Sequence, residues 1–272
     1  MKVPIYPFHI WLPEAHVESP TEGSVILAAV LLKVGGYGFS RVLLPMLPMA
    51  TLYFSSAVVV SCVLSIIYTS FSTLRQVDIK RIVAYSSIAH MNIAILGLMM
   101  LSPVSITGSL LLMFGHGIVS GGLSFMVGIL YDRYRTKLVM YYSGIAHCMP
   151  IFSVCFFLLV LGNIGMPGTS NFVGEFLISL CAVANNNTPC VLAISMSIFF
   201  RAFYSLFMYN RVVFGMSNRI IIYRDMTVLE FAVIAPLIVI MLYTGIYPKP
   251  FIDTVGTACI VAASAFFRLP SA

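Results

Sequence analysis

One lysine lies in the middle of a long apolar stretch and is the first candidate for chemistry. Lys33 follows ten uncharged residues after Glu22 and precedes seven more. A helix rises about 1.5 Å per residue, so Lys33 lies roughly 15 Å from Glu22, near the middle of a bilayer core about 30 Å thick. An ammonium group there costs about 2.5–3.5 kcal/mol unless polar groups solvate it, and snorkelling is typical of helix ends. We therefore expect Lys33 to lie in a protein-lined polar path, where a lysine can bind and release a proton.

Three more ionisable side chains lie inside apolar stretches and are candidates for the same path. Ser86, Ser87 and His90 share one helix face, since residues three or four positions apart are neighbours, and in lipid such a face must turn inward. His116 lies in the glycine-rich stretch GHGIVSGG, and a histidine within a membrane favours a proton relay. Glu175 follows a break rich in Gly and Pro. It is the natural acidic counterpart of Lys33, with a helix-start acid as the alternative.

The composition defines the elements that must position these groups. Of the 272 residues, 60% are hydrophobic and 9% are charged, whereas soluble domains have about 25% charged residues. The chain is therefore predicted to be an all-α, polytopic transmembrane bundle. The net charge of +6 indicates loop orientation rather than nucleic-acid binding, because the basic residues do not form one stripe.

Several kinds of site have no sequence signature here. The six cysteines include no CxxC pair, and no Cys–His pair has ligand spacing, which argues against a zinc or iron–sulfur site. The chain has no phosphate loop and no dinucleotide fingerprint. We therefore expect neither a metal nor a bound cofactor in this chain.

The apolar segments predict seven or eight spans and divide the chain into three regions. Residues 1–19, rich in proline and aromatics, are expected to be an interfacial segment, 20–250 the transmembrane region, and 251–272 an apolar tail that spans or lies flat. Glu230 is expected to be a helix-start acid. The spans are predicted at about 22–44, 51–71, 82–100, 104–130, 147–160 with 171–180, 191–210 and 228–247.

The broken region around LGNIGMPGTSN is predicted to be one discontinuous span, although its length also permits two short passes. Broken helices in transporters mark binding sites and ion paths. With one discontinuous span, Arg41 and Lys249 lie on one side of the membrane and all other loop bases on the opposite side. The side with more bases is expected to be the matrix or the cytoplasm. Those other bases are Arg75, Lys80, Arg81, Arg133, Arg135, Lys137, Arg211, Arg219 and Arg224.

Five stretches of the chain together resemble a known family. They read KVPIYPFHIWLPEAHVESPTEGSVILAAVLLKVGGYG, DIKRIVAYSSIAHM, GHGIVSGGLSF, GMPGTSNFVGEF and LEFAVIAPL…GIYPKPF. In this order they resemble the subunit 4 family of respiratory complex I, NADH:ubiquinone oxidoreductase. The resemblance covers roughly the whole chain and implies an antiporter-like proton-pumping module related to cation/proton antiporters, which remain the alternative.

The resemblance implies roles for individual residues. Lys2 matches the lysine before a broken seventh helix, Lys33 the central lysine of the next helix, and Glu175 the buried glutamate of a discontinuous twelfth helix. His116 matches a histidine on the same hydrophilic axis, and His90 joins these as a relay candidate from its polar face. NADH, FMN, iron–sulfur clusters and ubiquinone are expected in other subunits.

The chain also departs from the family pattern. Family members carry about six helices before the KxPxxPFH motif, including a glutamate that pairs with the first lysine. We expect a split subunit whose N-terminal half comes from a separate polypeptide, which leaves the depth of Lys2 dependent on that partner. The other expected partners are complex I membrane-arm subunits and the lipid bilayer. The expected location is the mitochondrial inner membrane, with the bacterial plasma membrane as the alternative.

Overall fold

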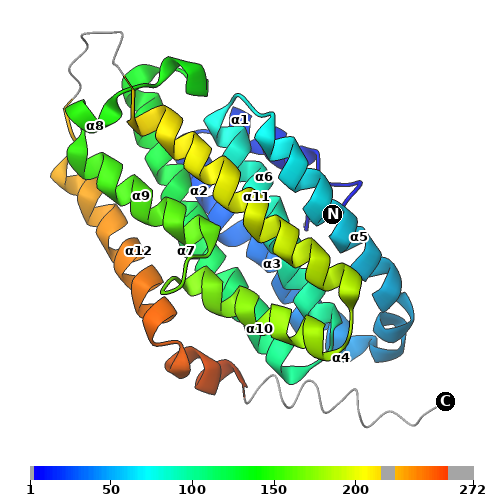
Figure 1. Ribbon diagram of the computed structural model, residues 1–272. Helices are drawn as coiled ribbons and strands as arrows, with labels where there is room; N and C mark the ends of the chain where they lie inside the picture. The colour runs from blue at the N-terminus through cyan, green and yellow to red at the C-terminus, as the bar shows by residue number, and fades with distance from the viewer. Residues whose placement is uncertain (1–2, 216–223, 257–272) are drawn as a thin grey trace.

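The computed structural model describes residues 3–215 and 224–256, and this part of the chain is helical (Figure 1). Six helices in it are long and apolar enough to cross a membrane, which confirms the polytopic all-α fold. The spanning helices are Thr21–Met46, which comprises α2 to α4, then α5 Pro48–Leu74, α6 Ile79–Met99, α7 Pro103–Tyr134, α11 Thr188–Val213 and α12 Val228–Ile246. The shorter ones are α1 Trp11–Glu18, α8 Ile145–Cys148, α9 Pro150–Ile164 and α10 Ser170–Ala184.

The bundle is built around α6 and α7. In the most apolar window of α6, 94% of the residues are buried, whereas the figure for the Thr21–Met46 span is 17%. Helix α7 contacts α2, α6, α9, α10 and α12. Small residues allow these approaches: a Cβ on Gly174 of α10 would lie 2.7 Å from the backbone nitrogen of Leu112 on α7. Such close packing replaces the hydrophobic driving force that helices lack in lipid.

The Thr21–Met46 span is irregular along its length. Helices α2 (Thr21–Ile26), α3 (Leu32–Tyr37) and α4 (Leu44–Met46) are joined by π-helical segments at Leu27–Leu31 and Gly38–Leu43. A π-segment widens the turn and shifts which side chains face a neighbour, and such segments are frequent at functional sites. The apolar pattern predicted this span but not its π-segments.

The predicted break lies between α9 and α10, which follow one another through the bundle (Figure 1). Helix α9 ends at Ile164 and is capped by Gly165, whose φ of +79° is a left-handed conformation that favours glycine. Gly168 also has a positive φ, of +93°, and α10 begins at Ser170. Neither helix reaches the length of a full span, as expected of the two arms of one discontinuous helix.

Loops at one end of the bundle lie close together. The ammonium groups of Lys80 and Lys137 donate to backbone carbonyls of Ser19 and Val17, at 3.0 and 2.6 Å, around the end of α1. Two bases far apart in sequence, Lys80 at the start of α6 and Lys137 in the loop after α7, therefore share one face, as the predicted charge asymmetry places them. Each lysine also satisfies a carbonyl that a helix end leaves unpaired.

A network of charges ties the start of α12 to α7 and α9. Glu230 forms a capping box with Thr227, as expected of a helix-start acid, and accepts a hydrogen bond of 2.8 Å from Arg133 of α7. The carboxylate of Asp225 accepts from the backbone amides of Ile151 and Phe152 at the start of α9. Lys2 and the tail beyond residue 256 lie outside the described residues, so those two expectations stay predictions.

Candidate functional site

A buried ion pair between two helices anchors one end of the site. The guanidinium of Arg201 on α11 donates to both carboxylate oxygens of Glu175 on α10, through Nη1 to Oε1 and through Nη2 to Oε2 at 2.8 Å. Arg201 is 0% exposed and Glu175 is 4% exposed. A bidentate guanidinium–carboxylate pair is strong and fixes the orientation of both groups.

His90 on α6 contacts both members of this pair. Its Nδ1 lies 2.9 Å from Arg201 Nη1 and 3.1 Å from Glu175 Oε1. On its other side, Nε2 lies 3.1 Å from the backbone oxygen and 3.2 Å from the side-chain oxygen of Asn163, near the end of α9. Since Arg201 only donates and Glu175 accepts, Nδ1 meets a partner whether it carries a proton or not.

His116 on α7 extends the cluster toward the first span. Its ring centroid lies 4.9 Å from that of His90, and neither ring nitrogen has a hydrogen-bond partner among the described residues. The side-chain oxygens of Ser170 and Asn171 on α10 are equally without partners there. A Cβ on Gly115 would lie 2.7 and 2.8 Å from these two oxygens. Buried polar atoms of this kind are where proteins hold ordered water.

Lys33 lies on the other side of α7 and bonds to a π-segment. Its ammonium group donates to the Ala28 carbonyl of its own helix, and Ser120 Oγ of α7 lies 3.4 Å from it. That hydroxyl lies 2.6 Å from the His116 carbonyl and 3.2 Å from the Ala28 carbonyl. Ser120 therefore bridges the lysine helix and the histidine helix.

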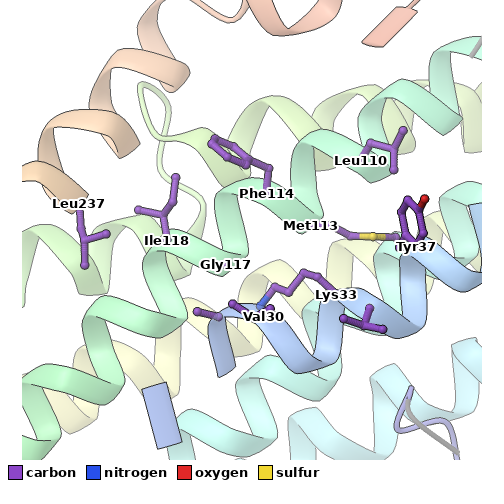
Figure 2. Close-up of a pocket in the computed structure, with 11 residues that line it drawn as sticks. Val30, Lys33, Tyr37, Leu110, Met113, Phe114, Gly117, Ile118 and Leu237 are labelled. Atoms are coloured by element: carbon purple, nitrogen blue, oxygen red, sulfur yellow. The ribbon is translucent and has the colours of Figure 1, made fainter. Parts of the chain in front are cut away.

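A pocket of about 540 Å³ lies beside Lys33 (Figure 2). Apart from the lysine it is lined by apolar side chains and backbone, with Tyr37 on one side and Phe114 and Leu237 on the other. The lysine side chain extends toward Gly117 of α7 (Figure 2), where a Cβ would lie 3.5 Å from Lys33 Cε. No carboxylate forms an ion pair with Lys33 in the part of the chain that the structure describes.

A much smaller cavity lies at the basic end of the bundle. It measures about 10 Å³, roughly enough for one water molecule, and Lys80, His16, Ser24 and Ser124 line it. Ser124 donates at 2.7 Å to the backbone carbonyl of Ser120, the residue whose hydroxyl lies near Lys33. In α1, outside the spanning helices, burial and the positive charges of Lys80 and Lys33 lower the pKa of His16 to about 4, so this ring is neutral at physiological pH.

The structure brings four of the five predicted relay residues near one another. Glu175, His90 and His116 form one cluster, and Ser120 connects it to Lys33. The buried polar face at Ser86, Ser87 and His90 is confirmed. Lys2 lies outside the described residues.

The expectation that Glu175 is the acidic counterpart of Lys33 is wrong, because its carboxylate is fully engaged by Arg201 and His90. Arg201 is not among the residues predicted from the sequence. Its signal was a single arginine in the otherwise uncharged middle of an apolar helix. Within the described ranges, no group of three His, Cys, Asp or Glu side chains is placed to hold a metal ion.

The spans, the broken helix and the buried ionisable groups define a membrane protein of the antiporter-like class. Residues 1–201 match the family described as "NADH:quinone oxidoreductase/Mrp antiporter, TM". The chain belongs to this family.

Individual relatives agree with the family match. NADH-ubiquinone oxidoreductase chain 4 of Marchantia polymorpha is 49% identical over 260 residues, which are 95% of this chain and 52% of that protein. A chain of the Thermus thermophilus respiratory complex I with bound NADH is 28% identical, with a TM-score of 0.89 over 97% of this chain and 56% of that one. The Mrp complex from Dietzia shares the fold at 16% identity, with a TM-score of 0.88 over 97% and 59%. The chain spans about half the length of the curated relatives it matches.

Proposed function

We propose that this chain is the C-terminal, proton-translocating part of subunit 4 of NADH:ubiquinone oxidoreductase in the mitochondrial inner membrane. The line of ionisable groups from Lys33 through His116 and His90 to Glu175 carries the proposal. Ionisable residues at membrane depth are rare and mark ion pathways and proton relays. The 49% identity to a chain 4 relative favours complex I as the assembly.

In this function the chain moves protons and performs no redox step. Lys33 takes up a proton from the side of the small cavity at the basic end of the bundle and releases it toward His116, past Ser120, whose hydroxyl lies near the lysine and bonds to the His116 backbone carbonyl. His116 and His90 pass it on toward the broken helix. NADH, FMN, iron–sulfur clusters and ubiquinone belong to other subunits, whose redox chemistry supplies the energy through electrostatic coupling.

The other half of the relatives' length would pack on the exposed Thr21–Met46 span. Only 17% of that span's window is buried, and Val30 beside Lys33 is 57% exposed. A cysteine at Val30 should cross-link to the polypeptide that carries the other half. A cysteine at Val60 on α5, 58% exposed, is the matched control and should face lipid. Equal cross-linking at both positions would overturn this placement.

The second candidate is a subunit of a multisubunit cation/proton antiporter, favoured by the family description and by the shared fold of the Mrp complex. The two functions differ in their energy source. Membranes holding the complex should acidify one side on NADH oxidation without a sodium requirement if it is complex I. Sodium-dependent proton exchange without NADH would instead identify the antiporter.

The relay itself is tested by Lys33→Met in the assembled complex. Methionine removes the titratable group at similar volume, so we expect NADH oxidation with much less proton translocation. Arg41→Met is the matched control, because Arg41 is an exposed base of the same helical span. Normal translocation in Lys33→Met would remove the mechanism.

A further inference from the structure

Arg201 is a buried cation that the relay described above does not use. It is fully buried on α11. Its two terminal nitrogens donate to the two carboxylate oxygens of Glu175, and Nη1 also lies 2.9 and 3.3 Å from the two ring nitrogens of His90. Its Nε donates to the Ser197 carbonyl at 3.2 Å, one turn back on the same helix. Each of these contacts fixes the guanidinium plane. An arginine does not give up its proton in proteins, so its charge is constant.

We propose that Arg201 and Glu175 form a fixed charge pair that serves His90 in both of its protonation states, and that His90 rather than Glu175 carries the proton at this end of the relay. Arg201 acts as a positioning residue through Glu175 and His90. The proposal rests on the proposed function and assigns the roles within it.

The geometry around His90 supports this assignment for each state in turn. When His90 is neutral with its proton on Nε2, that nitrogen donates to Asn163 and the bare Nδ1 accepts from Arg201 Nη1. When His90 is an imidazolium, Nδ1 donates to Glu175 Oε1, 3.1 Å away, and Nε2 still donates to Asn163. Nδ1 therefore has a partner in each state, and in the imidazolium state Nη1 of Arg201, which only donates, has to move away from the protonated Nδ1.

The proton balance is simple. His116 as an imidazolium releases its proton to neutral His90 and becomes neutral, and His90 becomes the imidazolium. Glu175 stays a carboxylate and Arg201 a guanidinium throughout. Glu175 has little freedom to take up the proton itself, because both of its oxygens accept from Arg201. Gly165 also packs closely against Oε2, since a Cβ at this position would lie 3.1 Å from that oxygen.

The groups that face His90 come from several helices. His116 lies on α7, Glu175 on α10 and Arg201 on α11, and Asn163 faces the ring from the end of α9. Lys33 contributes charge from α3 on the far side of His116. All of these groups affect the titration of His90. The pH profiles of proton translocation should therefore be compared between variants that differ at one of these groups and keep the others.

The test uses the assembled complex in sealed membrane vesicles, with protons translocated per NADH measured for Arg201→Gln, Glu175→Gln and the double variant. Either single change leaves one buried charge without its partner, and we expect both to lose translocation. The double variant replaces the ion pair by two amides that can hydrogen-bond each other and His90, so it should recover much of the loss. Lys33→Met is the reference for a broken relay. The control is Ser205→Ala, which removes a buried hydroxyl on α11 that hydrogen-bonds to backbone carbonyls of its own helix.

Two further readouts separate positioning from simple structural support. Arg201→Lys keeps the positive charge but loses the second nitrogen that bonds to Glu175. The complex should assemble in the same amount and still translocate protons, with a shifted pH profile. Infrared difference spectra taken across a pH change report protonated carboxyl groups. Because Glu175 should stay a carboxylate, the parent and Glu175→Gln should show the same bands in the protonated-carboxyl region.

Three outcomes would overturn the proposal. If Arg201→Gln translocates normally while Glu175→Gln and the double variant are equally inactive, Glu175 carries the proton. If only Lys33→Met loses translocation, the pair is structural. If Lys33→Met also translocates normally, the proposed function itself fails, and the proposal fails with it.

Discussion

Lys33 and Glu175 are both charges at membrane depth, and the protein treats them in opposite ways. Glu175 is 4% exposed, receives a bidentate arginine and a histidine, and lies against the glycine of a helix break. Lys33 bonds to one carbonyl of its own helix, has a serine hydroxyl 3.4 Å away, and borders a pocket of about 540 Å³. One charge is held in place, and the other is free to change its partner.

This difference follows from how each helix is packed. Helix α10 lies against α7, α11 and α12, whereas the Thr21–Met46 span has a largely exposed face. A buried ion pair is stabilising only when its geometry and its other hydrogen bonds are complete. A proton carrier needs the reverse, because a group that is equally well solvated in both protonation states exchanges its proton readily. Substitutions at the two kinds of position should therefore differ in their effect on stability.

Glu175→Gln should give the largest loss of stability. It leaves the Arg201 charge buried without its carboxylate, and breaking a buried pair costs about 3–5 kcal/mol. The amount of assembled complex and its thermal dissociation temperature should both fall. Glu14→Gln, at an exposed carboxylate of α1, should change neither. Equal stability of the two variants would contradict the account of a rigid, fully paired Glu175.

Gly245→Ala should have the next largest effect. A Cβ at Gly245 of α12 would lie 2.2 Å from the Gly168 carbonyl oxygen in the helix break, and backbone cannot move aside as a side chain can. Overpacking of this kind costs about 1–3 kcal/mol.

Gly38→Ala is the matched control in the open region, because a Cβ there meets nothing within 4 Å. Alanine favours helix over glycine by up to about 1 kcal/mol, so this variant should be as stable as the parent or more so. Thermal dissociation of the assembled complex compares the two. Equal destabilisation by Gly245→Ala and Gly38→Ala would show that the helix break and the Thr21–Met46 span are packed equally tightly.

The same contrast explains how much the sequence could predict. Lys33, His116 and the break around Gly165 were found because a charged residue in an apolar run, or a Gly and Pro cluster between two such runs, is a local signal. The partner of Glu175 is not local. Arg201 lies on another helix, and which face of α11 meets α10 depends on packing that no single stretch of sequence contains. Among the residues singled out from the sequence, Lys33 is the strong base in the middle of an apolar stretch, which favours it as the partner of Glu175.

The π-segments next to Lys33 were missed for a related reason. A widened turn retains the same apolar residues, so the pattern of Leu27–Leu31 is that of an ordinary helix. Its consequence is structural, since the Ala28 carbonyl is presented to both Lys33 and Ser120. The composition predicted the spans, and tertiary contacts determined how the site is assembled within them.

Lys33→Met should have the smallest effect on stability. Replacing an incompletely paired charge by an apolar side chain of similar volume is often neutral or stabilising, so we expect a change within about 1 kcal/mol. Thermal dissociation of the assembled complex measures it. A loss as large as that of Glu175→Gln would mean that Lys33 is held by contacts as tightly as the glutamate is.

The central claim is that Lys33 works by releasing its proton, and Lys33→Arg tests it most directly. Arginine keeps the positive charge but is not deprotonated in proteins. Protons translocated per NADH oxidised should therefore fall in Lys33→Arg as far as in Lys33→Met, with the complex fully assembled. Normal translocation by Lys33→Arg would mean that a fixed charge is enough at this position, and the relay described here would be wrong.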